Sequence, residues 1–550
     1  MRPQGCEAEL LRALAAMPFL DRLEMVAVTG WSRGPVYESA ARLESEGFCA
    51  SALHATDILP PSRRFHLTAA GLRRLADEED ISPDELVRSR PLSTQWRRGL
   101  MERMDALASV YHVASVVSNV SYPIDFRWYR AMPMDAAMRL PDGRTIGVVR
   151  QGLTADRSGF GKRVWRMRDQ PMPGVVLMLM ADHVRLRHAR RLLATTRIPA
   201  IFAVEREAAL SKPGDRIWSP SAVGASLDLR YVLDRLEPGG ELPVETEPQR
   251  ADFPADVAIE GPEWGIADHM LPFMLKSAEK RALDAIADWP WISLGDLAGL
   301  LGVSPQRASQ LVNPLEGLEL AVRPRDAGGR LAVTDRGLAL LSRRDRTSVA
   351  LARKRWSVSL EDPDAPMEWR NVFGSRSRQL LRNMEHTQSV HGFVGALTAQ
   401  APLLGWEVVQ IDPPRRASRH FRHEGGMRSV NPDAFGVLKK GDVTWAFFLE
   451  WERRAVRPST MSQRLAPYLR YYSSHRPTDD HGTRPSVLVV FDDEIAQTHF
   501  LRVAREEMRA EGATVPLLVS HREAVHALGP LGRAWRAPGD WESPQAPTPL

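Results

Sequence analysis

Hydrophobic and polar positions in the N-terminal 80 residues alternate first with a helical period and then with the period of a strand. Gly30 and Ser32 mark a turn between two of the predicted helices. The predicted elements, in order, are a helix around Leu10–Leu14, helices at 20–28 and 33–45, a basic extended run at 63–67 and a helix opened by Thr68. Three helices, a two-stranded wing and a closing helix are typical of a winged helix-turn-helix.

The same pattern returns later in the chain, which indicates an internal repeat. Residue numbers of matching turn and helix positions differ by a constant 272 between the two copies. The wing of the second copy is shorter, so the difference is 266 after it. The aligned pairs include Leu11 and Leu283, Pro18 and Pro290, Gly30 and Gly302, Ser32 and Ser304, Thr68 and Thr334, and Gly71 and Gly337. Chance does not easily supply Pro, Gly, Ser and Thr at the same turn positions, so the sequence predicts a tandem duplication.

The segments that follow each winged helix also correspond. Each contains apolar runs of strand length that alternate with helical patterns, as in 173–180 and 485–491. Alternating strands and helices predict an α/β domain with a mixed sheet. We therefore expect these parts: winged helix 1 at 1–80, α/β domain 1 at 81–236, a linker at 237–275, winged helix 2 at 276–346, α/β domain 2 at 347–536 and a disordered Pro-rich tail at 537–550.

Composition narrows the class of protein. The 550 residues include only two cysteines, which fits a reducing cytoplasm, and the longest apolar runs are too short to cross a bilayer. The net charge is +5, and most of the 73 basic residues are arginine. Arginine binds phosphate through two parallel hydrogen bonds, so this bias suits nucleic acid, although a GC-rich genome also produces it.

The most informative stretch for chemistry is 431–454. A turn at 439–442 joins two predicted strands, and this hairpin would bring Asp433 close to Glu450. Two carboxylates in one cleft are the oxygen ligands that Mg²⁺ prefers. The alternative is a hairpin with ordinary surface acids.

The C-terminal half, from about residue 277 to 536, resembles the replication-relaxation family of plasmid and mobile-element proteins. The similarity lies in the motifs HTQSVHGFVGAL at 386–397, NPDA at 431–434, FFLEWER at 447–453, Arg464–Leu465 with Tyr468, and VLVV at 487–490. The resemblance implies a winged helix followed by a restriction-endonuclease-like domain. The predicted fold is thus an α/β and α+β multidomain protein. It would contain two tandem copies of a winged helix followed by a restriction-endonuclease-like domain with a mixed sheet.

The resemblance also implies candidate catalytic residues, namely Asp433, Glu450, Glu452 and Arg464, with Mg²⁺ held by Asp433 and Glu450. Such nucleases use a lysine to activate water, but Glu452 and Arg464 occupy the lysine positions here. In the first copy only Asp135 of the acidic pair remains, which predicts a degenerate domain. The alternative for the second copy is that Asp433, Glu450 and Glu452 are structural remnants that contact Arg453 or Arg464.

A winged helix places its third helix in the major groove of DNA and its wing on the backbone. The candidate DNA-binding residues are Arg33, Arg42, Arg63 and Arg64 in the first copy, and Gln306, Arg307, Gln310, Arg323, Arg325 and Arg330 in the second. Glutamine can read adenine and arginine can read guanine, so the second copy is the better candidate for sequence preference. The alternative is that these winged helices bind protein and not DNA.

Three functions remain open from the sequence. The first is a cytoplasmic DNA-binding protein of a plasmid or mobile element, acting on double-stranded DNA in replication, DNA relaxation or transfer. The second is a Mg²⁺-dependent endonuclease that uses Asp433 and Glu450. The third is a non-catalytic adaptor that recruits a relaxase or replication initiator. A homodimer is compatible with each function, and no membrane partner is expected.

Overall fold

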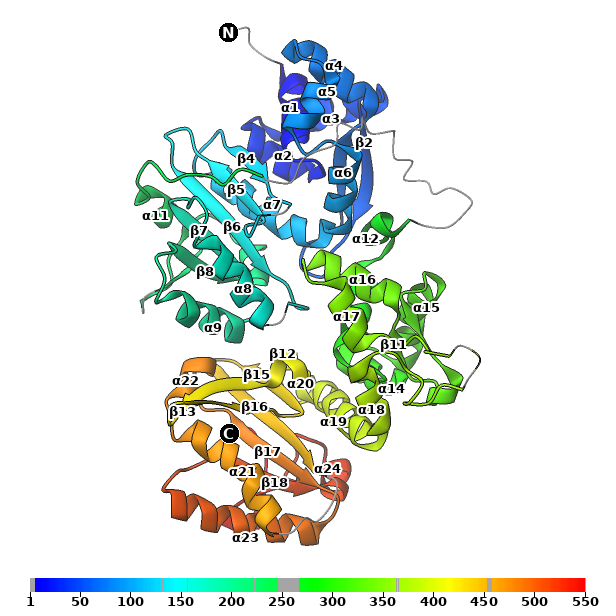
Figure 1. The fold of residues 1–550 in the computed structure, drawn as a ribbon, viewed down its shortest axis with the longest axis vertical. Helices are drawn as coiled ribbons and strands as arrows, with labels where there is room; N and C mark the ends of the chain where they lie inside the picture. Colours follow the sequence, from blue (N-terminus) through cyan, green and yellow to red (C-terminus); the bar gives the residue numbers. More distant parts are fainter. Residues whose placement is uncertain are drawn as a thin grey trace. The chain divides into compact units, whose positions relative to one another are not determined.

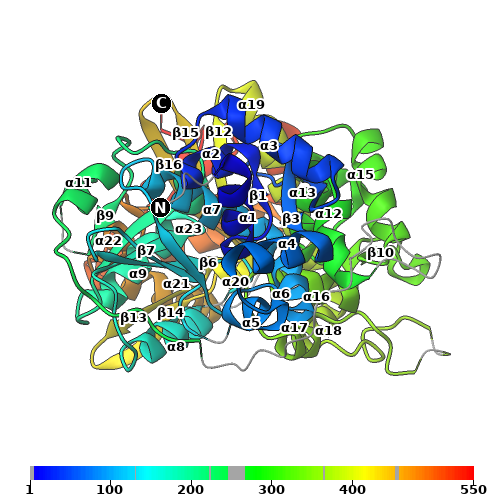
Figure 2. The same ribbon diagram turned by 90° about the horizontal axis from the view of Figure 1, so that it is seen from above.

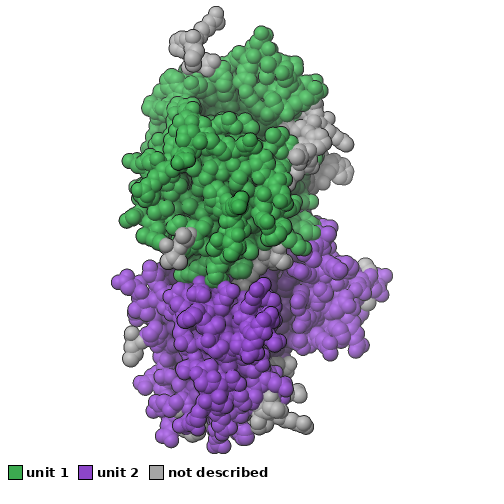
Figure 3. Space-filling model, turned by 60° about the vertical axis from the view of Figure 1, so that its left-hand side comes forward, with its two compact units in different colours: residues 1–280, 339–349 green, residues 281–338, 350–550 purple. Residues whose placement is uncertain are grey.

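The computed structural model shows a mixed α/β protein that divides into two compact units. It describes residues 5–130, 132–155, 157–221, 224–245, 267–362, 364, 366–452 and 458–549. The first unit contains residues 1–280 and 339–349, and the second contains 281–338 and 350–550 (Figure 3). The chain therefore crosses from one unit to the other three times.

The first unit begins with a helical module at residues 6–79, which we call the first helical module. Its elements are α1 (Cys6–Ala16), β1 (Leu20–Asp21), α2 (Arg22–Thr29), α3 (Arg33–Ser45), β2 (Cys49–His54), β3 (Ser62–Leu67) and α4 (Ala69–Glu79) (Figure 1). The strands form one antiparallel sheet in the order β1–β3–β2. Leu20 and Asp21, predicted at the start of the second helix, are strand residues because they pair with Phe65 and Arg64.

Residues 277–344 form the second helical module. Its elements are α13 (Ser277–Asp288), α14 (Leu294–Leu301), α15 (Pro305–Gly317), β10 (Ala321–Val322), η2 (Arg325–Ala327), β11 (Ala332–Val333) and α16 (Asp335–Arg344). The strands β10 and β11 are antiparallel, and Ile292 forms a single bridge to Leu331.

The two helical modules share hydrogen bonds at positions that the repeat aligns. The Thr68 N–H donates to the Phe48 carbonyl at 3.0 Å, and the Thr334 N–H donates to the Leu320 carbonyl at the same distance. The hydroxyl of each threonine accepts from the N–H of the glycine three residues later, at 3.2 Å in both modules. Gly30 and Gly302 end α2 and α14 in the left-handed conformation, which glycine adopts without strain.

An α/β domain follows the first helical module in the first unit. Its helices are α5 (Pro83–Ser89), α6 (Thr94–Glu102), α7 (Met104–Ser118), α8 (Arg157–Met167), α9 (His183–Leu193), α10 (Glu205–Ala208) and α11 (Leu229–Asp234). Its strands are β4 (Asp125–Trp128), β5 (Ala136–Arg139), β6 (Thr145–Gln151), β7 (Val175–Met180), β8 (Ala200–Val204) and β9 (Ser219–Pro220), in this order across the sheet. The pair β6–β7 and the pair β7–β8 are parallel, and the others are antiparallel.

The second α/β domain has the same succession of strand directions. Its sheet runs β12 (Glu407–Asp412), β15 (Ala434–Lys440), β16 (Val443–Glu452), β17 (Ser486–Phe491), β18 (Leu517–His521), β19 (Trp535–Ala537) and β20 (Asp540–Gln545), with a separate hairpin of β13 (Arg419–His423) and β14 (Gly426–Val430). Its helices are α17 (Val349–Trp356), α18 (Ser375–Arg382), α19 (Met384–Leu403), α20 (Pro414–Ala417), α21 (Pro458–Tyr472), α22 (Arg476–His481), α23 (Glu494–Glu511) and α24 (Arg522–Leu528).

The register of the two sheets makes individual positions comparable. In the first, Ala136 pairs with Val148; in the second, Ala434 pairs with Leu449. Asp135 and Asp433 therefore occupy the same place before the strand, and Val149 occupies the place of Glu450. In both α/β domains the central sheet pairs are parallel, so their strands end at one edge.

Helices cover both faces of the first sheet. One continuous apolar core joins the first helical module, α7 and one face of the sheet, and it contains Leu14, Leu107 and Ile146. A second apolar cluster joins α8 and α9 to the opposite face. Figures 1 and 2 show α7 and α9 on the two sides of β7. The predicted division at residue 80 thus runs through a shared core.

Two further boundaries differ from the sequence prediction. Of the predicted linker, 246–266 lies outside the described residues, whereas Leu242 is buried in the first unit and 268–274 is helical in η1 (Asp268–Met270) and α12 (Leu271–Met274). The predicted disordered tail contains β20, which pairs with β19. An edge strand tolerates the prolines of this segment because only one side must pair.

Candidate functional site

Asp433 and Glu450 lie opposite each other where β15 and β16 meet the parallel part of the second sheet. The Asp433 N–H donates to the Leu449 carbonyl at 2.8 Å, which continues the ladder by one residue beyond Ala434. Side chains opposite each other on paired strands point to the same face. The hairpin therefore brings the two carboxylates together as the sequence predicts.

Each carboxylate already has protein partners. His386 of α19 lies 3.0 Å from Asp433 through Nε2 and Oδ1, and the Trp451 N–H donates to Asp433 Oδ2 at 2.8 Å. Tyr468 of α21 donates its hydroxyl proton to Glu450 Oε1 at 2.5 Å. These contacts fix both acids from neighbouring helices.

Burial controls the charge of this group. Desolvation raises the pKa of Glu450 to about 8, the nearby Asp433 carboxylate adds to that effect, and the Tyr468 hydrogen bond opposes it. For His386, burial disfavours the cation, but the hydrogen bond to Asp433 outweighs it and raises the pKa. At neutral pH Glu450 is therefore mostly in its neutral form.

Glu452 and Arg464 form an ion pair beside this acid pair. Arg453, the other predicted partner of Glu452, lies outside the described residues. Arginine is charged at any pH relevant to the protein and cannot accept a proton from water. Arg464 can therefore stabilise a negative charge but cannot act as a general base.

A cavity of about 220 Å³ opens at these residues. Glu450, Glu452, Arg464 and Tyr468 supply its charged and polar wall. The rest of the lining comes from strands, helices and the end of the β13–β14 hairpin: Ser429, Val430, Asn431, Met461, Leu465, Pro467, Val487, Val489, Phe491, Phe500 and Leu517. Asp433 is not part of the lining, since its carboxylate is turned to His386 and the Trp451 N–H.

The oxygen ligands present suit Mg²⁺ in kind but are few in number. Among the described residues, no group of three or more His, Cys, Asp and Glu side chains has an arrangement that fits a metal ion. Asp433 and Glu450 are the two residues that would hold one. Binding would require Glu450 to lose its proton, because a cation binds the ionised carboxylate.

The first α/β domain fills the corresponding position with guanidinium groups. Asp135 is 2% exposed, and it accepts from the Arg150 N–H exactly where Asp433 accepts from the Trp451 N–H. Its carboxylate forms ion pairs with Arg103 (2.7 Å), Arg163 (2.6 Å) and Arg346 (3.1 Å). These three cations hold the pKa of Asp135 far below its usual range despite burial. Val149 replaces the second carboxylate, so this site has no room or charge for a metal.

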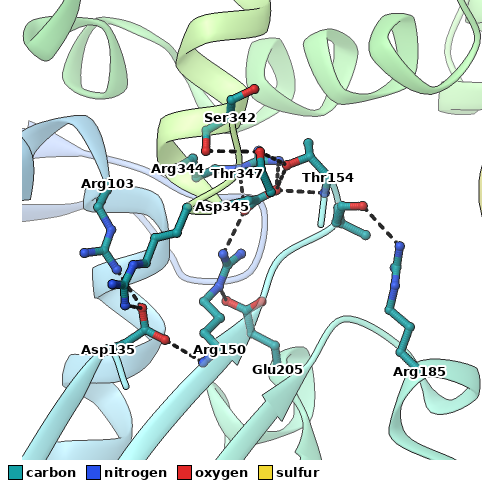
Figure 4. A network of polar contacts seen from close by, with 12 residues as sticks. Arg103, Asp135, Arg150, Thr154, Arg185, Glu205, Ser342, Arg344, Asp345 and Thr347 are labelled. Atoms are coloured by element: carbon teal, nitrogen blue, oxygen red, sulfur yellow. Dashed lines mark hydrogen bonds and ion pairs between the residues drawn. The ribbon is translucent and has the colours of Figure 1, made fainter. Parts of the chain in front are cut away.

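A second buried network continues from this site (Figure 4). Arg150 bridges Glu205 at 2.6 Å and Asp345 at 2.8 Å. Asp345 also accepts hydrogen bonds from the N–H and hydroxyl of Thr154, at 2.9 Å each. The Arg343–Arg346 segment, which contains the end of α16, is therefore packed within the first unit. Arg344 and Asp345 are buried, so neither side chain is available to a ligand at the surface.

The predicted DNA-binding residues of the first helical module are largely neutralised by acids. Arg42 pairs with Glu7 and Arg63 with Glu44, each at 3.0 Å. Arg33 is exposed at the start of α3. Arg64 was wrongly assigned to the wing surface: it is 2% exposed and pairs with buried Glu24 at 2.8 Å, because its position in the central strand β3 points to the core.

The second helical module presents a different surface. Gln306, Arg307 and Gln310 are exposed along the first turns of α15, and the Arg307 guanidinium donates to the Gln310 side-chain oxygen at 3.1 Å. In the segment 321–333, Arg325 is exposed, Arg323 pairs with Glu316 at 3.2 Å, and half-buried Arg330 donates to the Trp291 carbonyl. No acidic residue occurs in the sequence from 297 to 315.

His386 and Tyr468 are the site residues that sequence reasoning left without a role. Both occur in the motifs that carry the family resemblance, but neither lies near Asp433 or Glu450 in the sequence. Only the packing of α19 and α21 on the sheet brings them within hydrogen-bond distance.

The chain matches no family model, no curated protein and no solved structure. None of the helices in the described part of the chain is long and apolar enough to cross a membrane.

Proposed function

We propose that this chain is a DNA-binding protein of the replication-relaxation type, made of two tandem units that each combine a winged helix with a restriction-endonuclease-like domain. The shared hydrogen bonds of the helical modules and the shared strand directions of the sheets support the duplication. On this proposal the protein acts in the cytoplasm on double-stranded DNA of a plasmid or mobile element, in replication, relaxation or transfer.

The observation that carries the proposal is the exposed face of α15. Gln306 and Gln310 are one helical turn apart, and Arg307 lies between them on the same exposed side. Amide side chains pair with adenine and guanidinium groups with guanine in the major groove, each good pair contributing about 1–3 kcal/mol of discrimination. Helix α15 would therefore read sequence, with Arg325 of the wing on the backbone.

Binding to random duplex libraries, followed by fluorescence anisotropy on the selected site, tests this assignment. The triple variant Gln306→Ala/Arg307→Ala/Gln310→Ala should bind the selected site at least ~10-fold more weakly, which corresponds to one lost base pair contact. The control is Arg42→Ala, whose guanidinium is already paired with Glu7. Equal affinity of wild type and triple variant for the selected site would refute the reading role of α15.

A Mg²⁺-dependent endonuclease is the second candidate function, and the juxtaposition of Asp433 with Glu450 favours it. On this alternative Asp433 and Glu450 would hold the metal ion, which would supply Lewis-acid chemistry toward a phosphate and a water molecule. Arg464 would stabilise charge on the phosphate, and no lysine stands where such nucleases use one to activate water.

A non-catalytic adaptor for a relaxase or replication initiator predicts the opposite salt behaviour. Phosphate contacts release counterions, so log affinity falls steeply with log salt concentration. A protein that reaches DNA only through its partner shows no such slope in the purified state. Anisotropy between 50 and 200 mM salt separates these two functions.

A further inference from the structure

The cavity in the second α/β domain lies between the sheet and two helices. Val487, Val489 and Phe491 alternate along β17 and line the cavity, so they form its wall on one face of the sheet. Helices α21 and α23 pack against each other, and α23 packs against β17 and β18. These helices contribute Leu465 and Phe500 to the lining. The cavity is therefore formed mainly by regular elements of one domain.

The size and lining of the cavity suit a flat aromatic ligand. Most of the described lining residues are apolar, and the rings of Phe491 and Phe500 have their centres 5.2 Å apart. The volume is about 220 Å³. An apolar cavity of about 150 Å³ already takes up benzene. There is thus room for a ring system larger than one six-membered ring.

One part of the lining is polar. Glu450 pairs with Val489 across the parallel strands β16 and β17, so its side chain lies on the same face as the apolar wall. Tyr468 fixes the Glu450 carboxyl by donating to Oε1 at 2.5 Å. Each carboxyl oxygen has two lone pairs, so Glu450 can accept from a ligand in addition. Asn431, whose side chain donates to Ser429 Oγ at 3.1 Å, adds an amide to the lining.

A cation lies where the cavity meets the solvent. Arg464 lines the cavity, and its side chain is 43% exposed. It forms an ion pair with Glu452, which also lines the cavity. Arginine binds phosphate through two parallel hydrogen bonds. A ligand with its ring in the cavity and a phosphate outside would therefore contact Arg464.

We infer that this cavity binds an unpaired nucleobase that carries an exocyclic amino group, with the ring beside Phe500 and the amino group donating to Glu450. Adenine, guanine and cytosine have such a group, whereas thymine has a carbonyl and a methyl group. Proteins that take a base out of the stack hold it among apolar and aromatic side chains and bind its edge by hydrogen bonds. The inference rests on the proposed function in taking DNA as the source of the base, but it uses no residue of α15.

The fluorescence of 2-aminopurine, a purine analogue with an exocyclic amino group, tests this inference. The full chain is titrated into a single-stranded thymine oligonucleotide that contains one 2-aminopurine, with EDTA present so that no metal ion occupies Glu450. We expect a saturable change in fluorescence. An oligonucleotide with one adenine should compete at least ~10-fold better than one with thymine only, because thymine cannot donate to Glu450. Equal competition overturns the inference.

A variant that fills the cavity gives an independent test. Val489→Phe adds a ring inside the cavity, and we expect it to weaken binding of the 2-aminopurine oligonucleotide at least ~10-fold. The matched control is Val443→Phe at a 43% exposed position of β16, which should bind like the wild type. Unchanged binding by Val489→Phe, with folding checked by thermal unfolding, overturns the inference. If this variant does not fold, the competition between adenine and thymine in the wild type still decides.

Two further comparisons separate the source of the base and the proposed function. Deoxyadenosine monophosphate that competes as well as the adenine oligonucleotide identifies a free nucleotide as the ligand, and weaker competition identifies a base within a strand; both outcomes support the base site. If the chain binds the 2-aminopurine oligonucleotide but selects no duplex, the base site stands and sequence reading by α15 fails. If it binds a selected duplex through α15 without any 2-aminopurine signal, the proposed function stands and the base site is refuted.

Discussion

Asp433 accepts a hydrogen bond from the N–H of Trp451, the residue that directly follows Glu450 in β16. This contact holds the aspartate against the strand that carries the second carboxylate. The same bond joins Asp135 and the Arg150 N–H in the first α/β domain, where the second carboxylate is replaced by Val149. The geometry around the aspartate is thus independent of whether the acid pair is present.

Cleavage of supercoiled plasmid distinguishes a working acid pair from a structural one. If Asp433 holds Mg²⁺, Asp433→Asn should reduce nicking by at least ~100-fold, because the neutral amide is a much weaker metal ligand. Agarose-gel assays with Mg²⁺ and with EDTA measure this effect. Asp442→Asn in the exposed turn of the same hairpin is the control and should nick at the wild-type rate. Wild-type protein that shifts DNA but leaves it supercoiled contradicts the endonuclease.

Stability should fall with rising pH because of Glu450. Its pKa is about 8 in the folded protein, compared with 4.5 for an unperturbed glutamate in the unfolded chain, so the folded state binds the proton more tightly between these values. The free energy of unfolding therefore decreases as pH rises from 5 to 8. Glu450→Gln should make this decrease shallower by more than about 1.4 kcal/mol, the equivalent of one pKa unit.

Urea unfolding of both proteins at pH 5, 6, 7 and 8 measures the difference. The glutamine remains neutral throughout and keeps an oxygen that can accept from Tyr468. Parallel curves for wild type and Glu450→Gln would mean that Glu450 is ionised in the folded protein at neutral pH.

Gly71 and Gly337 should tolerate no side chain. A Cβ atom would lie 2.0 Å from the Phe48 carbonyl oxygen at the first position and 2.3 Å from the Leu320 carbonyl oxygen at the second. Backbone must therefore move, and we expect Gly71→Ala and Gly337→Ala each to destabilise by about 1–3 kcal/mol or more. Gly99→Ala in α6, where no atom lies within 4 Å, should instead stabilise by about 0.5–1 kcal/mol. Thermal unfolding compares the three variants.

Arg346 should be essential for the stability of the first unit. Its guanidinium donates to the carbonyls of Arg130, Met132 and Met134 and pairs with Asp135. Arg346→Ala removes these charge-assisted bonds, and we expect a loss of about 2–4 kcal/mol. Arg346→Lys should restore only part, because an ammonium cannot reproduce the planar fork.

Hydrogen exchange of residues 125–151 reports on this loss directly, since these residues surround Asp135. Arg325→Ala, at an exposed position in η2, should leave their exchange unchanged. Unaltered exchange in Arg346→Ala would show that Arg103 and Arg163 suffice to neutralise Asp135.

Local chemistry made much of the fold predictable. Turn glycines, N-cap threonines and the hairpin turn at 439–442 are set by a few neighbouring residues, and their positions follow from sequence alone. The proximity of Asp433 to Glu450 was predictable for the same reason, because a short turn fixes the register.

Contacts between distant segments were not predictable in the same way. The sequence gives no sign that Arg64 faces Glu24 in the core, or that Arg346 enters the site of Asp135. An arginine in a basic run has the same local pattern whether it faces solvent or a buried acid. His386 likewise joins the site only through packing of α19.

The position of Arg346 in the chain has a consequence for synthesis on the ribosome. Asp135 and its neighbouring strands are made long before Arg346, yet the ion pairs of Asp135 are complete only when that arginine arrives. Asp105 likewise pairs only once Lys280 has been made. At synthesis rates of about 5–20 residues per second, the nascent first unit must wait roughly 10 seconds or more with part of its interior charge uncompensated. A gene truncated before codon 346 should therefore yield a product that chaperones hold or proteases remove.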